Sequence, residues 1–569
     1  MKHNSVPKFL NGLPAALLLS AVLSVVPFLI RPVYYMTGDD YLLNYIANGS
    51  YGMAGSSHLV FIRVLYGVLL KVLYTLTTAV NWYLVMLILL LIVSFTVIYS
   101  ELLRQGRWLP LIPAVIMHAL VVPFFLSFTV IAFLAGGAGA ILLAASLRTG
   151  RTWRRAAAVC GGLLLCMICR CLRKDAFLPC LAVMFPLLLC AFYSAVFRAE
   201  NRTRRTNILL QTAGILLLLA CGAAAEEKVE LYAYSQPDWH DFRNYTFARS
   251  AVVDYPPASY EASREAFEQA GLTELDYDLL RGWKYAEKSL FSEKTLREVS
   301  RITASALTKN ARINYAKRVC PRPYLLFFAL PLLMFAVMLC ANRSYPVVPG
   351  ILGLLIFYAL NVMLLFVRLR FVMRVAGPLA MLTIICLCLL PAASGQSLPR
   401  GTKRSYAAAF CFSAAFLAAG TAFMMFFTRA NAVPRISPDE WPKSQITAEM
   451  EAHKDTLYIL DGSILNVLYY NGTPAADVMT TSRFSNIVRA GSWDTYSPRF
   501  YAQAGMLVND PENLLTSFAR TDNTVFVGTE ADLIASFLQE RTGALYVAEP
   551  QSFPELQTRL FRFRPYQAP

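Results

Sequence analysis

The chain has 569 residues, of which 56% are hydrophobic and only 15% are charged. Soluble proteins have about a quarter of their residues charged, so this composition excludes an ordinary soluble domain. The formal charge of +16 does not indicate nucleic-acid binding, because the basic residues gather in short loops between apolar runs and the tail from Arg435 onward holds more acids than bases. We therefore predict a membrane protein without a nucleic-acid partner.

Apolar runs of about 18 residues or more, each long enough to cross the ~30 Å hydrocarbon core of a bilayer, recur along the chain. They predict eleven spans near residues 11–30, 82–103, 110–127, 130–147, 156–172, 176–197, 207–225, 323–341, 346–367, 375–392 and 406–428. The first run follows two lysines and lacks a convincing cleavage site, so we expect an uncleaved span. With the N-terminus inside, the basic loops at 148–155, 198–205 and 400–404 fall in the cytoplasm, as the positive-inside rule requires, and the C-terminal tail falls outside.

The stretch from His58 to Thr77 is apolar enough to be a further span. It carries Arg63, Gly67 and Lys71 at four-residue spacing, which forms a narrow polar stripe on one helical face. We predict a helix lying in the membrane interface, with this stripe toward water. The alternative is a span, which would move the basic loops on one side of it to the wrong compartment.

The expected organisation alternates membrane modules with extracytoplasmic blocks. The predicted divisions are an N-terminal membrane module at 1–225 with a first outer loop at 31–81, an extracytoplasmic helical loop at 226–322, a C-terminal membrane module at 323–428 and an extracytoplasmic α/β domain at 435–569. Within the helical loop, periodicity predicts helices around Tyr260–Ala270, stopped by Gly271, and around Ser292–Leu307.

The tail contains alternating strand and helix signals. Thr456–Leu460, Asn523–Gly528 and Ala544–Ala548 are rich in strand-forming residues, and Thr529 is a plausible N-cap for a helix that reaches Glu540. A strand, a helix and a strand in succession predict a parallel pair in a small α/β domain.

Two adjacent carboxylates stand in the first outer loop, in the sequence Thr37-Gly38-Asp39-Asp40-Tyr41. Neighbouring acids repel, so keeping both ionised needs a cation, a metal or a shared proton. This pair is the candidate catalytic centre. The alternative is a solvated turn, because glycine and aspartate are also typical of turns.

Two very short outer hairpins break the positive-inside rule. Their charged residues are Arg173, Lys174 and Asp175 in one hairpin and Arg368, Arg370 and Arg374 in the other. The guanidinium fork matches phosphate oxygens in a bidentate way, so these sets are candidates for binding a lipid-linked phosphate. The alternatives are headgroup anchoring by snorkelling side chains and, for Asp175, simple neutralisation of its neighbours.

Three further residues are candidate substrate contacts. His58 would orient an acceptor or a phosphate, or would be structural. Trp239 and His240 would stack on a sugar, although a tryptophan at a membrane edge is more often an interfacial anchor.

Carboxylates beside phosphate-binding cations suggest glycosyl transfer from a polyprenyl-phosphate sugar. Asp40 is expected to be the general base for an acceptor hydroxyl, with Asp39 as its partner or a metal ligand. The cations would stabilise the departing phosphate. A single displacement would invert the anomeric centre.

The first span, the acidic pair at Asp39 and Asp40 and the following membrane-surface helix resemble the GT-C superfamily of membrane glycosyltransferases. Gly38 to Tyr41, with Asn48-Gly49 and His58 after it, further resembles bacterial envelope proteins assigned to that superfamily. The resemblance covers the pattern of about the first 230 residues and implies a GT-C-like protein of the bacterial plasma membrane, a family in which a soluble outer domain after the last span is common. Together with the spans and blocks above, the expected fold is a polytopic α-helical membrane protein of about eleven spans, with a helical outer loop and a small C-terminal α/β extracytoplasmic domain. Asp175 would match a second acidic position that some members carry.

The resemblance also implies the partners. These would be a polyprenyl-phosphate sugar donor, membrane lipid, and an envelope glycan, lipid or protein as acceptor. The cofactor is left open, with a divalent cation possible, because no Asp-x-Asp triplet accompanies the pair. Three alternatives remain: a transporter or flippase for a lipid-linked oligosaccharide, a ligase or polymerase of cell-surface polysaccharide, and a non-catalytic envelope scaffold.

Overall fold

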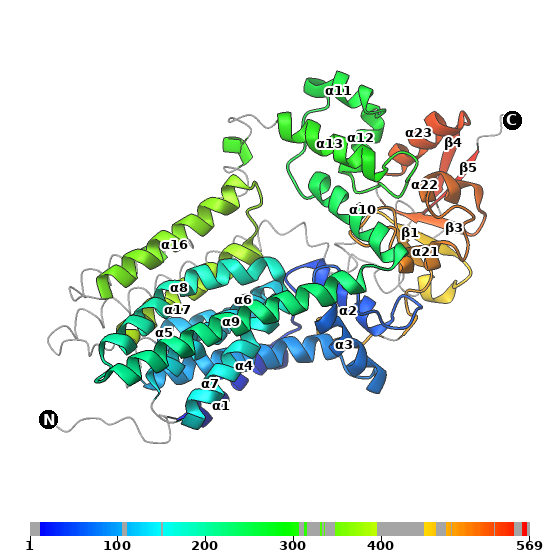
Figure 1. Cartoon of the computed structure of the whole chain (residues 1–569). Helices are drawn as coiled ribbons and strands as arrows, with labels where there is room; N and C mark the ends of the chain where they lie inside the picture. Colours follow the sequence, from blue (N-terminus) through cyan, green and yellow to red (C-terminus); the bar gives the residue numbers. More distant parts are fainter. Residues whose placement is uncertain are drawn as a thin grey trace.

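The computed structural model describes residues 12–104, 111–149, 152–306, 312–315, 331–332, 335, 347–394, 449–462, 474–479, 481–528, 530–550 and 560–565. Within these residues, eight helices are long and apolar enough to cross a membrane. They are α1 (Leu13–Ile30), α4 (Trp82–Arg104), α6 (Phe128–Arg148), α7 (Thr152–Leu172), α8 (Lys174–Phe197), α9 (Arg202–Ala233), α16 (Val347–Val367) and α17 (Met373–Ala393). The chain is thus a polytopic helical membrane protein in which these helices form one bundle (Figure 1).

Three of the eleven predicted spans are not among these eight. The run at 406–428 lies outside the described residues, as does most of the run at 323–341. The run at 110–127 forms α5 (Leu111–Phe124), whose 14 residues extend about 21 Å, less than the ~30 Å of the hydrocarbon core. The chain leaves this helix early because Ser127 caps the next one, accepting a hydrogen bond from the Thr129 backbone.

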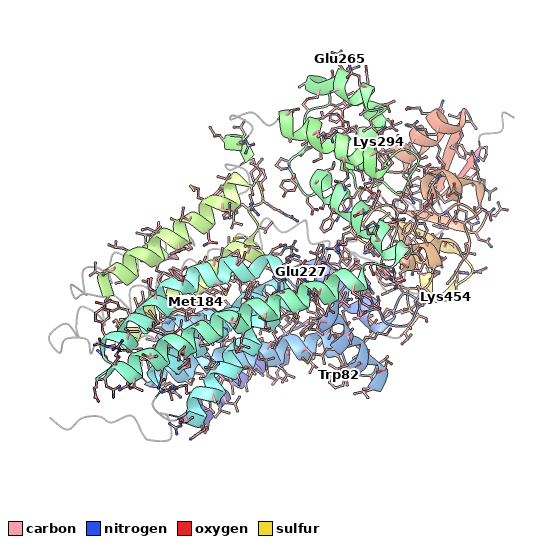
Figure 2. The ribbon with its side chains drawn as sticks, viewed as in Figure 1. Trp82, Met184, Glu227, Glu265, Lys294 and Lys454 are labelled. Carbon is pink, nitrogen blue, oxygen red and sulfur yellow. The ribbon has the colours of Figure 1, made fainter. Side chains whose placement is uncertain are left out.

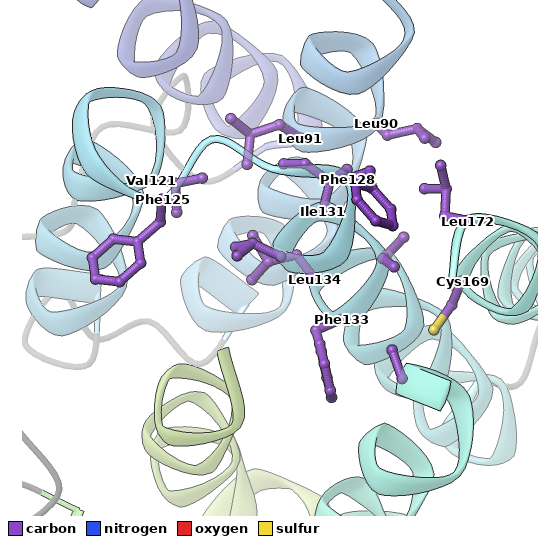
Figure 3. Close-up of a cluster of buried hydrophobic side chains, with 14 of the residues drawn as sticks. Leu90, Leu91, Val121, Phe125, Phe128, Ile131, Phe133, Leu134, Cys169 and Leu172 are labelled. Carbon is purple, nitrogen blue, oxygen red and sulfur yellow. The ribbon is translucent and has the colours of Figure 1, made fainter. Parts of the chain in front are cut away.

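Helix α6 lies at the centre of the bundle, and nearly all of its residues are buried. Its glycines allow close approach of its neighbours: a Cβ at Gly136 would meet the sulfurs of Cys169 and Cys180, and one at Gly139 would meet the Gly162 backbone of α7. The apolar side chains of α4, α5, α6 and α7 interdigitate around it (Figure 3). This packing fixes the helix ends on which the outer loops stand.

The first outer loop forms two short helices, α2 (Gly38–Asn48) and α3 (Val64–Leu76). The 13 residues of α3 extend about 20 Å, too short for a span. Its exposed residues are mostly apolar, with Leu65, Val68, Val72 and Leu76 among them. Of the predicted polar stripe, Lys71 is exposed as expected, but Gly67 is buried and Arg63 is buried against α9.

Helix α9 continues eight residues past the predicted end of its span at 225, so the boundary expected at 226 falls inside a helix. The extension carries Glu226, Glu227 and Glu230, which pair with cations of other helices. Those ion pairs let a charged helix end stay packed on the bundle. Glu227 marks the place where the bundle meets the extramembrane part, while Met184 lies within the bundle (Figure 2).

The outer block beyond α9 is helical. It contains α10 (Pro237–Val253), α11 (Arg264–Gln269), α12 (Glu274–Arg281) and α13 (Glu293–Ala306). The two helices expected from periodicity correspond to α11 and α13, and Gly271 follows α11 with a positive φ of 78°, a conformation that glycine adopts without strain. Helices α10 and α12 were not predicted.

The tail forms a five-stranded sheet in the order β2-β1-β3-β5-β4. The strands are β1 (Leu457–Leu460), β2 (Ile487–Arg489), β3 (Thr524–Val527), β4 (Tyr546–Pro550) and β5 (Leu560–Pro565). Helices α21 (Pro498–Ala504), α22 (Leu514–Ser517) and α23 (Ala531–Thr542) accompany them. The expected N-cap Thr529 lies outside the described residues.

The predicted parallel pair on either side of α23 is wrong. Strand β5 lies between β3 and β4 and pairs antiparallel with both. The parallel partner of β3 is instead β1, which also pairs in parallel with β2. The last strand of the chain, β5, thus lies between β3 and β4, which the strand-helix-strand pattern predicted to pair directly with each other.

Both faces of the central strands are buried. Tyr458 and Leu460 belong to the cluster of the bundle and the first outer loop, whereas Leu457 and Ile459 share a core with α10, α12 and α13. The outer helical block and the tail therefore form one packed unit (Figure 1).

The tail is also bonded to the first outer loop. The Ala475 backbone N–H donates to the Val33 carbonyl (2.7 Å), and the Phe484 N–H donates to the Ser50 carbonyl (2.6 Å). Gln503 Nε2 donates to the Tyr51 carbonyl (2.9 Å). These contacts hold the end of the chain over the acidic pair.

Candidate functional site

Asp40 is built into the first turn of α2. It is fully buried, and both carboxylate oxygens accept hydrogen bonds. Thr37 Oγ1 donates to Oδ2 (2.8 Å), while the Tyr83 hydroxyl and the Phe128 N–H donate to Oδ1 (2.9 and 2.8 Å). Burial raises the pKa of Asp40 to about 6, against the lowering effect of these bonds.

This environment does not favour the expected role of Asp40 as general base. A base must reach the proton that it removes, and Asp40 is enclosed by α2, α4 and the start of α6. The carboxylate instead joins three elements of the fold. The accessible member of the pair is Asp39.

Asp39 occupies the neighbouring position with a side chain that is 21% exposed. Arg374, at the start of α17, contacts its Oδ2 (2.5 Å). Trp493, four residues after β2, donates its indole N–H to Oδ1 (3.2 Å). Three parts of the chain that are more than 100 residues apart therefore meet at one carboxylate.

Arg370 lies in the same hairpin as Arg374 and contacts Asp254 of the outer block (2.9 Å). Asp254 is also 3.5 Å from Arg249, which is almost fully buried. Arg368 is exposed and has no ion-pair partner among the described residues. Two of the three predicted arginines therefore belong to the site, and the exposed Arg368 does not join them.

Arg173 immediately precedes α8 and lies between two aromatic rings, 5.1 Å from the centre of Phe61 and 5.8 Å from that of Phe128. Its side chain is 13% exposed, and its nearest carboxylate, Asp175, is 3.5 Å away and 81% exposed. Burial, followed by the nearby cations Arg374 and Arg370, lowers the pKa of Arg173. Arg173, Arg370 and Arg374 therefore lie close enough to interact electrostatically, and Asp39, which contacts Arg374, lies among them.

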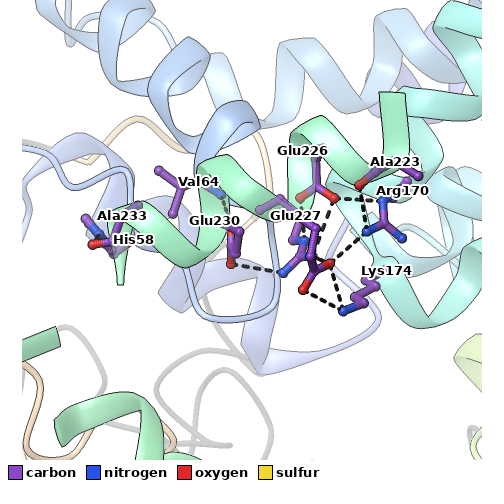
Figure 4. A network of polar contacts seen from close by, with 10 residues as sticks. His58, Val64, Arg170, Lys174, Ala223, Glu226, Glu227, Glu230 and Ala233 are labelled. Carbon is purple, nitrogen blue, oxygen red and sulfur yellow. Dashed lines mark hydrogen bonds and ion pairs between the residues drawn. The ribbon is translucent and has the colours of Figure 1, made fainter. Parts of the chain in front are cut away.

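Lys174 does not join this group. It contacts Glu227 (2.9 Å) at the edge of a second charged network, which also contains Arg63, Arg170 and two more glutamates of α9 (Figure 4). In that network Arg63 and Arg170 lie 2.6 and 2.7 Å from Glu226. Its three acids and three bases balance, so it fastens α3 and α7 to α9 rather than attracting an anion.

His58 and Trp239, predicted independently, lie together. Their rings stack with centres 3.9 Å apart and planes 10° apart. His58 Nε2 is 3.2 Å from the Ala233 carbonyl at the end of α9. His240 points elsewhere: its side chain is 60% exposed and lies 3.4 Å from Asp241.

Sequence reasoning missed Trp493, Asp254 and the glutamates of α9. The glutamates gave a usable signal, because Glu226, Glu227 and Glu230 follow an apolar run at helical spacing. Trp493 and Asp254 gave none, since only the folded chain brings them to the first outer loop.

The described residues contain no group of three or more His, Cys, Asp or Glu side chains placed to hold a metal ion. The site is therefore defined by one accessible carboxylate, Asp39, and the cations Arg173, Arg370 and Arg374. No protein-family model matches the chain, and neither do the curated proteins or the solved structures.

Proposed function

We propose that the protein is a membrane glycosyltransferase that moves a sugar from a polyprenyl-phosphate donor to an envelope acceptor. The observation that carries this proposal is the contact between Asp39 of the first outer loop and Arg374 of the far half of the chain. It joins a base and a phosphate-binding cation in one place, with Arg370 and Arg173 beside them.

In the proposed step the acceptor oxygen attacks the anomeric carbon as the bond from that carbon to the phosphate oxygen breaks. Asp39 takes the acceptor proton, and polyprenyl phosphate leaves with the bonding electron pair. Arg374, Arg370 and Arg173 stabilise the negative charge that develops on the phosphate. Arg374 already compensates the charge of Asp39, so an arriving phosphate would exchange with that carboxylate for the same guanidinium. One displacement inverts the anomeric configuration.

The sidedness of the bundle supports the proposal. Arg148 contacts Glu101 (3.1 Å) at the end of the bundle that also carries the basic stretch around Arg202 to Arg205. Helix α2, whose first turn holds the acidic pair, lies at the opposite end of the bundle, as do the outer helices α10 to α13 and the sheet of the tail (Figure 1). The positive-inside rule assigns the basic end to the cytoplasm, so the Asp39 site opens outside, where lipid-linked sugars are consumed.

The arrangement of the first outer loop supports membership of the GT-C superfamily. An acidic pair opens α2, and α3 follows with mostly apolar exposed residues suited to lipid. This order is the one on which the resemblance of the sequence rests. The three-way contact at Asp39 adds the cations that such chemistry needs.

The test uses membranes from cells that express the full chain, supplied with radiolabelled polyprenyl-phosphate hexoses and pentoses. Asp39→Asn is expected to lower transfer by about 10²–10⁴, and Arg374→Gln is expected to lower it strongly as well. Glu261→Gln is the control, because it removes a carboxylate of the outer block that is 65% exposed and contacts Arg264 rather than an arginine of the site. Full transfer by Asp39→Asn would refute the proposal.

Two further arms separate the alternative functions. A lipid-linked oligosaccharide diphosphate tests a ligase or polymerase, because only such an enzyme would transfer the whole glycan from it. Vesicles that hold a fluorescent lipid-linked sugar on one leaflet test a flippase. Movement of that lipid by Asp39→Asn without any transfer would favour transport over the proposed chemistry.

A further inference from the structure

A cavity of about 220 Å³ lies at the junction of the first outer loop, α3, α10 and α21. This volume is below the ~300 Å³ at which sites for drug-sized ligands begin, so it suits a single small unit. The charged and aromatic residues that line it are His58, Lys71, Trp239, Phe242, Asp494 and Arg499. The serines Ser56, Ser57 and Ser497 add hydroxyl groups to the same walls.

The charge on these walls is positive. Asp494 is the one carboxylate among the lining residues, and it contacts two arginines, Arg489 at 2.5 Å and Arg499. Lys71 also lines the cavity and has no ion-pair partner among the described residues. Lys71 and Arg499 outnumber the one carboxylate in the lining, so a small anion that enters the cavity meets a net positive charge, with Lys71 as the ammonium group that no carboxylate compensates.

The histidine in the wall is an acceptor. Burial lowers the pKa of His58, so the neutral imidazole predominates. Its Nε2 lies 3.2 Å from the Ala233 carbonyl and must donate to it, which leaves Nδ1 with a lone pair for a hydroxyl donor. Trp239 and Phe242 add apolar ring surface. Hydroxyl acceptors next to aromatic surface are suited to a sugar ring.

The cavity borders the Asp39 site. Trp493, which donates to Asp39, is followed by the wall residue Asp494. The ring of Phe61, next to the wall residue Val60, lies 4.9 Å from that of Trp493. Ile46 in the wall is seven residues along α2 from Asp39, which corresponds to about 10 Å.

We propose that this cavity binds one unit of an anionic saccharide, a sugar that carries a carboxylate or a phosphate group. Lys71 binds the anion, His58 and the serines bind hydroxyls, and Trp239 and Phe242 contact the ring. As a subsite for the acceptor, the cavity rests on the proposed glycosyl transfer. The binding itself requires neither a donor nor Asp39.

The test measures binding by isothermal titration calorimetry on the detergent-solubilised full chain, without any donor. The probes are glucuronate, glucose 6-phosphate, glucose and inorganic phosphate. We expect glucuronate or glucose 6-phosphate to bind about fivefold more tightly than glucose, as one exposed charge interaction allows. The two anionic sugars distinguish a carboxylate from a phosphate ligand, and inorganic phosphate is expected to bind more weakly than either.

The variants assign that preference to the cavity. Lys71→Gln should abolish the advantage of the anionic sugars, and Trp239→Leu should weaken all three sugars. Lys228→Gln is the matched control, because Lys228 is an exposed lysine on α9 at the same end of the bundle and outside the cavity. Equal affinity for glucose and the anionic sugars, an unchanged preference in Lys71→Gln, or phosphate binding as tight as glucose 6-phosphate would overturn the proposal.

Asp39→Asn separates this inference from the proposed transfer. That variant should bind the anionic sugar as the unaltered chain does, even though transfer is lost. Binding that persists while no donor is consumed by the unaltered chain would leave the cavity assignment standing and remove the glycosyltransferase proposal. Normal transfer without any binding of the anionic sugars would remove the cavity assignment and leave the glycosyltransferase proposal standing.

Discussion

Substitutions of Asp40 test whether this carboxylate holds the fold together. Asp40→Asn keeps an oxygen for the Tyr83 hydroxyl and the Phe128 N–H, and its amide can donate to Thr37 Oγ1. Asp40→Ala leaves the two buried donors without an acceptor. Each unsatisfied donor costs about 1–3 kcal/mol, so the alanine variant should be less stable than the asparagine variant by about 2–6 kcal/mol.

The pKa of Asp40 adds a dependence on pH. Burial raises this pKa from 3.8 to about 6, so the folded chain binds the proton more tightly than the unfolded chain. The stabilisation is fully present below about pH 4 and is lost as the pH rises through about 6. The shift corresponds to about 3 kcal/mol. Asp40→Asn, which carries no charge, should therefore exceed the unaltered chain in stability by about that amount near neutral pH and match it near pH 4.

Thermal unfolding of the detergent-solubilised chain, followed by tryptophan fluorescence across this pH range, measures both effects. Asp175→Asn serves as the control, since its carboxylate is 81% exposed. An alanine variant as stable as the asparagine variant would refute the hydrogen-bond argument. A difference between Asp40→Asn and the unaltered chain that does not change with pH would refute the argument from burial.

Three further predictions address the surroundings of the site. Arg63→Gln should destabilise the chain by about 3–5 kcal/mol, because Arg63 is buried among the glutamates of α9. Lys174→Gln removes a cation of the same network that is 48% exposed and should change the melting temperature little. Trp493→Phe should lower sugar transfer about fivefold, the equivalent of one hydrogen bond of about 1 kcal/mol, without a loss of thermal stability. Gly67→Ala should reduce the yield of folded protein, because its Cβ would lie 2.0 Å from the Ser57 carbonyl oxygen, whereas Gly214→Ala meets no atom within 4 Å and should be neutral in the same expression assay.

The membrane helices could be predicted because each is encoded locally. A run of apolar residues long enough for the bilayer suffices, and α1, α4 and α16 begin and end within three residues of their predicted positions. The observed end of a helix differs from the predicted end where side chains from a distant part of the sequence contact it. Helix α9 runs on to Ala233 because Arg63 and Arg170 neutralise its glutamates, and no local pattern states that those arginines lie beside it.

The candidate site was likewise predictable in part, where the information is local in the sequence. The pairing rule for adjacent acids indicated that Asp39 and Asp40 need a counter-charge, and Arg374 supplies one. The rule could not tell which of the two aspartates would be accessible. Accessibility depends on burial, and Asp40 is buried by contacts with Tyr83 and Phe128 from other helices. The sheet order escaped prediction for a similar reason, since β5 enters from the end of the chain.

The position of the tail leads to a prediction about its removal. Strands β1 and β3 bury one face in the cluster shared with the bundle and the first outer loop and the other in the core shared with α10, α12 and α13. A chain that ends before residue 449 would expose both surfaces at once, together with the unpaired backbone groups of Val33 and Ser50. It should therefore lose the folded first outer loop as well as the tail. Limited proteolysis of the truncated chain in membranes should cut between residues 31 and 63, where the full chain resists cleavage; a first outer loop that stays protected after truncation would show that the tail is a detachable module.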